Sequence, residues 1–125
     1  MTDATTTLAD LRAAVGAFVS ERAWEKYHTP KNLAMSIAIE AAELMEHFQW
    51  LRPEEAQAVG QDAEQRSALG AELADVTSYV LALCNVLDLD LSAAVESKLA
   101  QNRIRYPVER CYGEYRREMK SGEGG

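Results

Sequence analysis

The sequence contains few of the residues that would indicate a disulfide scaffold or a β-sheet. Its 125 residues include two cysteines and three prolines. Cys84 and Cys111 belong to no C-x-x-C pair or Cys/His cluster, so they indicate ordinary packing in a reducing compartment. No convincing run alternates β-branched or aromatic residues with polar ones, as a strand would, and the abundant alanine favours helix. The sequence therefore predicts an all-α protein.

Basic residues are also scarce. The chain carries 13 lysines and arginines against 20 aspartates and glutamates, a formal net charge of −7. It therefore lacks the broad basic face of a protein that binds nucleic-acid polymers, and an anionic substrate would need a cation beside it. No signal peptide is indicated, and no apolar run is expected to span a bilayer. These absences predict a cytoplasmic protein without a membrane partner.

Helical spacing and capping residues predict four main helices in a single domain that covers residues 1–125. Residues 1–6 and about 119–125 are expected to be disordered. A short helical turn is expected between Pro53 and Gly60. The main helices are expected from a cap at Thr7 to about Tyr27, from Pro30 to about Trp50, from a cap at Asp62 to about Leu87, and from a cap at Asp90 to about Tyr106.

Two pairs of acids interrupt the most apolar helices. Glu40 and Glu43 lie three residues apart in SIAIEAAELMEHFQW, and Glu72 and Asp75 repeat the spacing in ALGAELADVTSYVLAL. Residues three apart lie on nearly the same face of a helix, so each helix presents two carboxylates together. Such pairs are common on solvated faces, but a buried carboxylate needs a compensating charge. The apolar surroundings therefore favour a binding site over a solvated face.

A divalent cation would compensate these carboxylates. No lysine or arginine occurs in residues 34–50 or 67–87, which cover both pairs. An all-oxygen ligand set favours magnesium, with manganese as a substitute. A di-iron site usually adds E-x-x-H motifs on the same helices, and His47 is preceded at that distance by Leu44. Zinc lacks its usual histidine and cysteine ligands.

Aromatic residues accompany the acids. A helical stripe that continues from Glu43 through His47 would place Trp50 about 10 Å along the axis from Glu43, a distance that suits a metal on phosphates and a ring on a base. Trp24 and Tyr79 are further candidates for contact with a base. The alternative for each of these rings is simple packing in the fold.

Basic and amide side chains form two candidate phosphate contacts. Lys31 and Asn32 lie in the first turn of a predicted helix, where free backbone amides attract anions. Lys98, Asn102 and Arg105 recur at helical spacing near the end of the last main helix. Basic residues also suit the dipole at a helix C-terminus, so a structural role is an equal alternative for that group.

Three segments resemble the MazG-like all-α nucleoside triphosphate pyrophosphohydrolases, most nearly their dCTP pyrophosphatase branch. These segments are HTPKNLAMSIAIEAAELMEHFQW, ALGAELADVTSYVLAL and SKLAQNRIRYP. The similarity covers about residues 8–108. Its specific signature is E-x-x-E followed by E-x-x-D, flanked by W-E-x-[YF]-H-x-P-[KR]-N and N-R-x-R-Y-P. The resemblance implies a four-helix MazG-like bundle that assembles as a dimer or a dimer of dimers, with pockets partly built across subunits.

The resemblance also implies an activity and a site. Such enzymes hydrolyse a nucleoside triphosphate to the monophosphate and pyrophosphate, here dCTP or modified pyrimidine deoxynucleotides in nucleotide-pool house-cleaning. The dCTP-preferring vertebrate members carry a histidine near the base where this chain has Val15, which leaves the base preference open. The implied site residues are Glu40, Glu43, Glu72 and Asp75 as magnesium ligands and catalytic acids, Trp24, Trp50 and Tyr79 around the base, and Lys31, Lys98, Asn102 and Arg105 at the phosphates.

Two other functions remain open from the sequence. One is a non-enzymatic helical interaction module whose acids bind a structural ion or a basic partner. The other is a related phosphohydrolase directed at another substrate, such as dUTP or phosphoribosyl-ATP. An oligomer is expected on separate grounds, because a helix apolar on nearly all sides, such as residues 62–87, needs more partners than three short helices supply.

Overall fold

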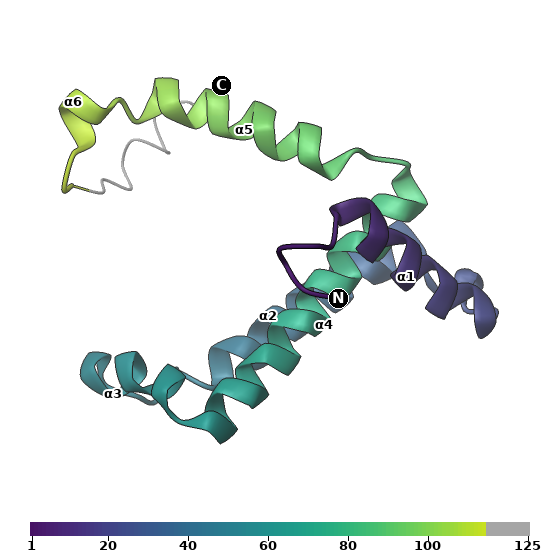
Figure 1. Cartoon of the computed structure of the whole chain (residues 1–125), viewed down its shortest axis with the longest axis horizontal. Helices are drawn as coiled ribbons and strands as arrows, with labels where there is room; N and C mark the ends of the chain where they lie inside the picture. The colour runs from purple at the N-terminus through teal and green to yellow at the C-terminus, as the bar shows by residue number, and fades with distance from the viewer. Residues whose placement is uncertain (115–125) are drawn as a thin grey trace. The chain divides into compact units, whose positions relative to one another are not determined.

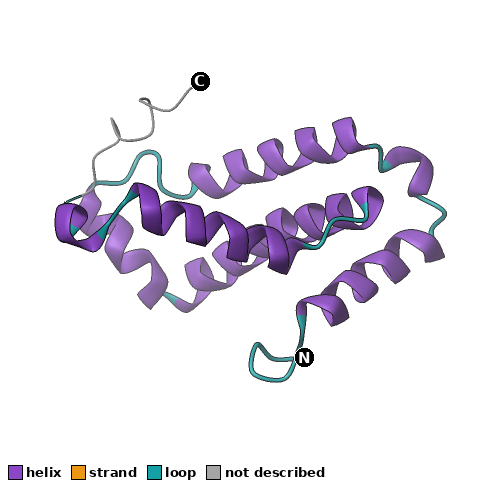
Figure 2. Cartoon of the chain, turned by 90° about the horizontal axis from the view of Figure 1, so that it is seen from above, coloured by secondary structure: helices purple, strands orange, loops and turns teal. Residues whose placement is uncertain are grey.

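The computed structural model describes residues 1–114, and within that range the chain forms helices, turns and connections without a strand (Figure 2). This confirms the all-α prediction. The chain divides into two compact units, Met1–Leu89 and Asp90–Gly125. Each unit is described by itself, and the expectation of a single domain stays a prediction. The expectation for residues 119–125 lies outside the described residues.

The first unit is built around a long helix, α4 (Ala63–Leu87), which packs along α2 (Pro30–Glu46) and less extensively against α1 (Leu8–Glu21) (Figure 1). Its connections contain the short helix α3 (Pro53–Ala58). Two single turns of 3₁₀-helix complete it: η1 (Glu25–Tyr27) and η2 (Val59–Gln61). Gly60 lies in η2, so the expected short helical segment is present.

The long helices of this unit begin at the residues that their capping chemistry predicts. Thr7 and Asp10 form a complete capping box at α1, with reciprocal N···O distances of 2.9 and 3.1 Å. Thr29 Oγ1 accepts the N–H of Asn32 at 3.2 Å at the start of α2. Asp62 accepts a backbone N–H three residues on at 3.0 Å at the start of α4. These side chains satisfy donors that lack an intrahelical partner.

Helix α1 ends at Glu21, so the prediction that it continues to about Tyr27 is wrong. Ala23 adopts the left-handed backbone conformation, with φ 51°, and its N–H bonds to the carbonyl three residues back. The N–H of Trp24 then bonds to the carbonyl of Val19 at 3.1 Å. This pair of bonds is a Schellman motif, which usually has glycine where this chain has Ala23. Without a glycine at this position, the end of α1 at Glu21 could not be predicted from the sequence.

Helix α2 ends at Glu46, and the prediction that it continues to about Trp50 is also wrong. Residues 47–50 form turns instead. Arg52 then has extended backbone, with ψ 158°, as a residue before a proline prefers. Trp50 is therefore outside the helix, and the predicted stripe that spaced it along the axis from Glu43 does not exist.

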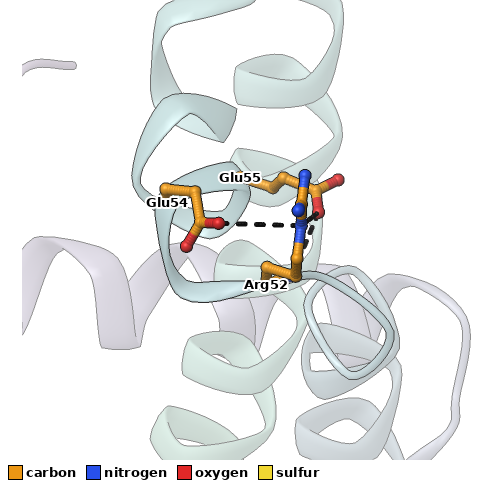
Figure 3. Close-up of polar contacts among 3 residues, drawn as sticks. All are labelled: Arg52, Glu54 and Glu55. Carbon is orange, nitrogen blue, oxygen red and sulfur yellow. Dashed lines mark hydrogen bonds and ion pairs between the residues drawn. The ribbon is translucent and has the colours of Figure 1, made fainter.

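The short helix α3 begins with an exposed ion-pair cluster (Figure 3). Arg52 Nε lies 2.7 Å from Glu55 Oε1 and 3.6 Å from Glu54 Oε1. Glu55 Oε1 also accepts the backbone N–H of Arg52 at 3.4 Å, which closes the first turn after Pro53. Exposed pairs of this kind contribute little to stability, so their role is to define where α3 starts.

The core of the first unit is small. The buried apolar residues of α4 are Leu81, Ala82 and Cys84, all in its C-terminal half. In the N-terminal half, Leu73 is 52% exposed. The expectation that this helix is buried on most sides is therefore wrong for the first unit by itself, because α1 and α2 cover only part of the helix.

By length and composition α4 could span a bilayer, contrary to the expectation that no segment could. That observation is weak, because the central helix of a soluble protein passes the same test. Here α4 packs against α1 and α2 and carries Glu72 and Asp75 near its middle.

Residues 1–6, which were expected to be disordered, form a turn. The N–H groups of Thr5 and Thr6 both donate to the carbonyl of Thr2, at 3.1 and 2.9 Å. The hydroxyls of Thr2 and Thr5 lie 2.9 Å apart. Threonine side chains thus add local hydrogen bonds that favour a turn over an extended tail.

The described part of the second unit contains α5 (Leu91–Arg105) and the short α6 (Val108–Cys111). Asp90 caps α5 by accepting the N–H of Ala93 at 2.9 Å, as expected. The helix stops before Tyr106 and Pro107, also as expected.

Candidate active site

Helices α2 and α4 bring three of the four predicted acids together. Glu40, Glu43 and Glu72 each offer a carboxylate oxygen, and these oxygens lie within 4.8 Å of one another. We call these three residues the acid cluster. Asp75 lies outside this group, although it is on the same helix as Glu72 and its charge acts on Glu40. The three-residue spacing thus predicted the pairs, and the packing of α2 along α4 joins them.

The acid cluster changes the protonation of one of its members. The largest effect that raises the pKa of Glu40 is a side-chain hydrogen bond with Glu43, followed by burial of the carboxyl. The negative charges of Glu43, Asp75 and Glu72 raise this pKa further. Two carboxyl groups share a hydrogen bond only when one of them carries a proton. Without a cation, the cluster therefore keeps a proton to a higher pH than a solvated glutamate does.

Within residues 1–89, neither lysine nor arginine forms an ion pair with the acid cluster or Asp75. His47 Nε2 lies 3.6 Å from Glu72 Oε1. Among the described residues, Oε2 of Glu40 and Oε2 of Glu72 are buried and have no hydrogen-bond partner. Buried acceptors of this kind require an explanation, and an oxygen-only donor set fits a hard divalent cation.

The sequence has one E-x-x-H motif, from Glu25 to His28, in the connection between α1 and α2. Neither residue joins the acid cluster. The helix-borne E-x-x-H arrangement that supports di-iron sites is therefore missing from these acids.

A cleft of about 490 Å³ has one of the four predicted acids, Asp75, in its lining. One wall is α1 and the other is α4, while Trp24 and His28 enter from the connection after α1. Asp75 therefore links the charged site to a concave, mostly apolar space. The residues that line the cleft are Ala14, Val15, Phe18, Val19, Trp24, His28, Asp75, Ser78, Tyr79 and Ala82.

The Schellman turn at the end of α1 orients the aromatic side of the cleft. It brings Trp24 back onto Phe18, with ring centroids 5.8 Å apart and planes at 78°, an edge-to-face contact. Arg22 Cζ lies 3.8 Å from the centroid of the Phe18 ring, and its Nη1 donates to the Phe18 carbonyl at 3.0 Å. Trp24 remains 42% exposed, so one part of its ring is available to a ligand.

The structure places the two predicted tryptophans differently. Trp24 lines the cleft together with Tyr79. Trp50 is 86% exposed and is not among the residues that line the cleft within the described chain. The contact of Trp50 with a base therefore stays a prediction.

The residues predicted to contact phosphates belong to two different units of the chain. Lys31 is exposed in the first turn of α2. The N–H of Asn32 is occupied by Thr29, and its side chain donates to the carbonyl of Tyr27 at 3.1 Å. The expectation of a free backbone amide at Asn32 is therefore wrong, because that group completes the cap. Lys98, Asn102 and Arg105 lie on α5 in the second unit, and their part in the site stays a prediction.

The cleft also contains residues that the sequence did not single out as site residues, among them Phe18, His28 and Ser78. Ser78 lies three residues after Asp75 and so on the same face of α4. That spacing was the signal that could have found it.

A MazG-like family profile matches residues 35–118, a range that contains all four predicted acids. The chain belongs to the MazG-like family. Among curated relatives, dCTP pyrophosphatase 1 of Rattus norvegicus is 41% identical over 107 residues, which cover 86% of this chain and 63% of that protein. Its Homo sapiens counterpart is 42% identical over 102 residues, which cover 82% and 60%. This MazG-like chain thus matches less than two thirds of the length of these relatives.

A solved structure shares the fold of this MazG-like chain. It is the crystal structure of a pyrophosphatase from Archaeoglobus fulgidus, with a TM-score of 0.73 and 38% sequence identity. The match covers 86% of this chain and 98% of that one. The resemblance to the MazG-like family is therefore confirmed.

Proposed function

We propose that this MazG-like chain is a hydrolase that converts (deoxy)nucleoside triphosphates to the monophosphate and pyrophosphate. The observation that carries the proposal is the acid cluster with two unpartnered buried oxygens, together with an aromatic-lined cleft. Asp75 belongs to both settings, because its charge acts on Glu40 and its side chain lines the cleft. A nucleotide needs both parts, a cation site for the polyphosphate and a concave apolar site for the base. The names of the rat, human and Archaeoglobus relatives support a pyrophosphatase.

Magnesium is the proposed ion, with manganese as a substitute, and the acid cluster together with Asp75 would hold it. When bound, the ion would neutralise phosphate oxygens and lower the pKa of a coordinated water. The buried oxygens of Glu40 and Glu72 are the acceptors that such a ligand would satisfy. The proposal rests on this donor chemistry, which suits magnesium better than zinc.

The proposed reaction is in-line attack of water at the α-phosphorus. A bond forms between the water oxygen and that phosphorus, and the bond to the bridging oxygen breaks, so pyrophosphate leaves. One carboxylate among the four acids would orient the water and accept its proton. Lys31 and, from the second unit, Lys98, Asn102 and Arg105 are the proposed contacts of the phosphates.

The base would lie in the cleft against Trp24 and Tyr79. Its volume of about 490 Å³ is within the range of small-molecule sites. We propose dCTP or a modified pyrimidine deoxynucleotide as the substrate, on the strength of the relatives' name. Val15 offers no hydrogen bond at its wall position, so polar recognition would come from Ser78 and His28. The proposed role is nucleotide house-cleaning in the cytoplasm.

The proposed assembly is a homodimer or a dimer of dimers. An open apolar groove lies between α2 and α4, and it is lined by Ala41, Leu44, Met45, Phe48, Leu69 and Leu73. Exposed apolar surface of this kind on a central helix favours an interface with a second copy. An interface would also give the exposed Trp50 a route into a neighbouring subunit's cleft.

The proposal is tested with purified protein, magnesium and a panel of canonical and modified triphosphates, with pyrophosphate quantified. We expect release of pyrophosphate and the monophosphate in equal amounts, fastest with a pyrimidine deoxynucleotide, and no release in excess chelator. Turnover restricted to dUTP or phosphoribosyl-ATP would support the related specificity instead. No pyrophosphate from any nucleotide would leave the interaction module as the function.

A further inference from the structure

We propose that Arg12 is a positioning residue that, paired with Asn85, holds α1 in place as one wall of the cleft. The four hydrogen bonds described next are called the Arg12–Asn85 clamp. The role assigned to the cleft rests on the proposed function, whereas the mechanical role of the clamp does not.

The clamp joins the start of α1 to the end of α4. Arg12 Nε donates to Asn85 Oδ1 at 3.0 Å, and Asn85 Nδ2 donates back to the Arg12 carbonyl at 3.0 Å. Arg12 Nη1 donates to the Leu89 carbonyl at 2.8 Å, and Nη2 to the Cys84 carbonyl at 3.2 Å. The guanidinium thus binds carbonyls in and just after the last turn of α4, where a positive charge also suits the helix dipole.

Only arginine among the natural side chains can make this set of contacts. Its planar fork presents three donors in fixed directions, whereas a lysine ammonium acts as a point charge on a flexible stem. Asn85 complements the fork because it accepts and donates at once. The clamp therefore fixes both the position of α1 along the axis of α4 and the distance between the two helices.

Packing alone holds α1 weakly. Val19 is its one buried residue. A second cavity of about 230 Å³ lies between α1 and α4, bordered by Gly16 and Val19 on one side and by Ala82 and Asn85 on the other. With one buried residue and an open pocket at this junction, α1 makes few dispersion contacts with α4, so the directional hydrogen bonds of the clamp add the constraint that packing lacks.

The clamp lies one to two helical turns from the cleft on both helices. Val15 and Phe18 follow Arg12 along α1, while Ala82 and Tyr79 precede Asn85 along α4. A pivot of α1 about its start would therefore move Phe18, and with it the Trp24 ring that packs on Phe18. Binding of the base would weaken while the acid cluster on α2 and α4 stays in place.

The test compares Arg12→Met and Asn85→Leu with the control Arg52→Met. Among the described residues, Arg52 makes its contacts within its own segment. For the first readout, each change is made in a Trp50→Phe background, so that Trp24 is the sole tryptophan. Acrylamide quenching of its fluorescence is then measured without nucleotide. For the second readout, KM and kcat are measured in the full chain with Trp50 present.

We expect Arg12→Met and Asn85→Leu to raise the quenching constant of Trp24 about twofold, because the local structure around it opens. We expect KM to rise about tenfold with kcat changed less than about threefold, the signature of weakened binding without damage to the chemistry. Arg12→Lys, which keeps the charge and one donor direction, should raise KM about threefold. Arg52→Met should match the unmodified chain.

A folded Arg12→Met protein with the quenching constant of Arg52→Met would overturn the proposal, as would a fall in kcat at unchanged KM. If circular dichroism shows that Arg12→Met does not fold, the proposal is tested with Arg12→Lys by the same two measurements, quenching of Trp24 and the kinetic constants. A chain that releases no pyrophosphate at all would contradict the proposed function, but the fluorescence comparison would still support or overturn the clamp.

Discussion

At Glu40, the charged form that the proposed metal site requires is unfavourable for the stability of the metal-free fold. The residue shares a hydrogen bond with Glu43 and has one buried oxygen without a partner, so its charged form is unfavourable in the metal-free chain. Its raised pKa means that the folded state holds this proton more tightly than the unfolded state does. This contribution to stability is fully present below the ordinary glutamate pKa, and it is lost as the pH rises through the raised folded value.

The first prediction concerns Glu40→Gln. In chelator at neutral pH we expect this variant to melt at a higher temperature than the unmodified chain, because the amide keeps the shape and removes the unfavourable charge. The difference should shrink as the pH falls below the ordinary glutamate range, where the Glu40 carboxyl is protonated. With magnesium, we expect its pyrophosphate release to fall at least about 100-fold, as it should for Asp75→Asn.

Glu46→Gln is the matched control, because Glu46 lies on the same helix outside the acid cluster. It should change neither the melting temperature in chelator nor the turnover by much. Full activity in both Glu40→Gln and Asp75→Asn would contradict the metal assignment. An unchanged or lower melting temperature for Glu40→Gln in chelator would contradict the electrostatic account.

Among the elements, the turn after α1 carries local strain. Ala23 occupies the left-handed region, where its Cβ meets the following carbonyl oxygen. The strain is retained because this turn directs Trp24 back onto Phe18 and into the cleft. Asp88, also at positive φ, ends α4 with the same pair of Schellman bonds, but aspartate tolerates that conformation better than alanine does.

The second prediction is that Ala23→Gly stabilises the first unit by about 0.5–1 kcal/mol, because relief of about 1–2 kcal/mol of strain exceeds the extra entropy of the unfolded chain. The matched control is Ala17→Gly, the same chemical change at an exposed position inside α1. That control should destabilise by about 1 kcal/mol. Urea unfolding measures the change in the free energy of unfolding for both variants. A loss of stability in Ala23→Gly would contradict the strain at Ala23.

At the level of helices, the sequence predicted starts better than ends. Caps at Thr7, Asp62 and Asp90 are short-range chemistry, in which one side chain binds an amide three residues on. The end of α1 depends on a left-handed alanine that no propensity scale favours, so it could not be predicted. The prediction for the end of α2 failed for a related reason, because the turns at residues 47–50 come before Pro53, the residue that signals a break.

The candidate site also has a part that could be predicted from local sequence and a part that could not. Spacing along one helix predicted which acids lie on one face, and the apolar surroundings predicted that they would meet. The cleft could not be predicted, because its walls belong to α1 and α4 and their positions depend on long-range contacts such as the Arg12–Asn85 clamp. Trp50 was placed by extending a helix that stops at Glu46, so that error followed from the helix boundary.

For the molecule as a whole, the incomplete burial of α4 in the first unit is the observation on which we base the proposed interface with a second copy. Its N-terminal half presents Leu69 and Leu73 to an apolar groove shared with α2. Charged substitution in such a groove should separate two subunits, because an interface core excludes unpaired charge. An interface here would explain both the composition of α4 and the exposure of Trp50.

The third prediction is that Leu73→Asp converts a dimer or larger assembly to a monomer. Sedimentation over a range of concentrations measures the change, and far-ultraviolet circular dichroism should show that the helices remain. Leu73→Met, which keeps the residue apolar, should leave the assembly intact. An unmodified chain that is monomeric throughout, or a Leu73→Asp chain that associates as before, would contradict this interface.

Asp75 belongs to two parts of the structure: its charge raises the pKa of Glu40, and its side chain lines the cleft. Under the proposed function, randomising α4 near this residue to select for a new base would therefore alter the proposed metal site as well as the cleft. The opposite wall has no such conflict, since Ala14, Val15 and Phe18 lie on a helix that carries none of the four acids. A laboratory evolution library confined to those three codons could sample bases of new shape while leaving the four acids of the proposed hydrolytic site unchanged.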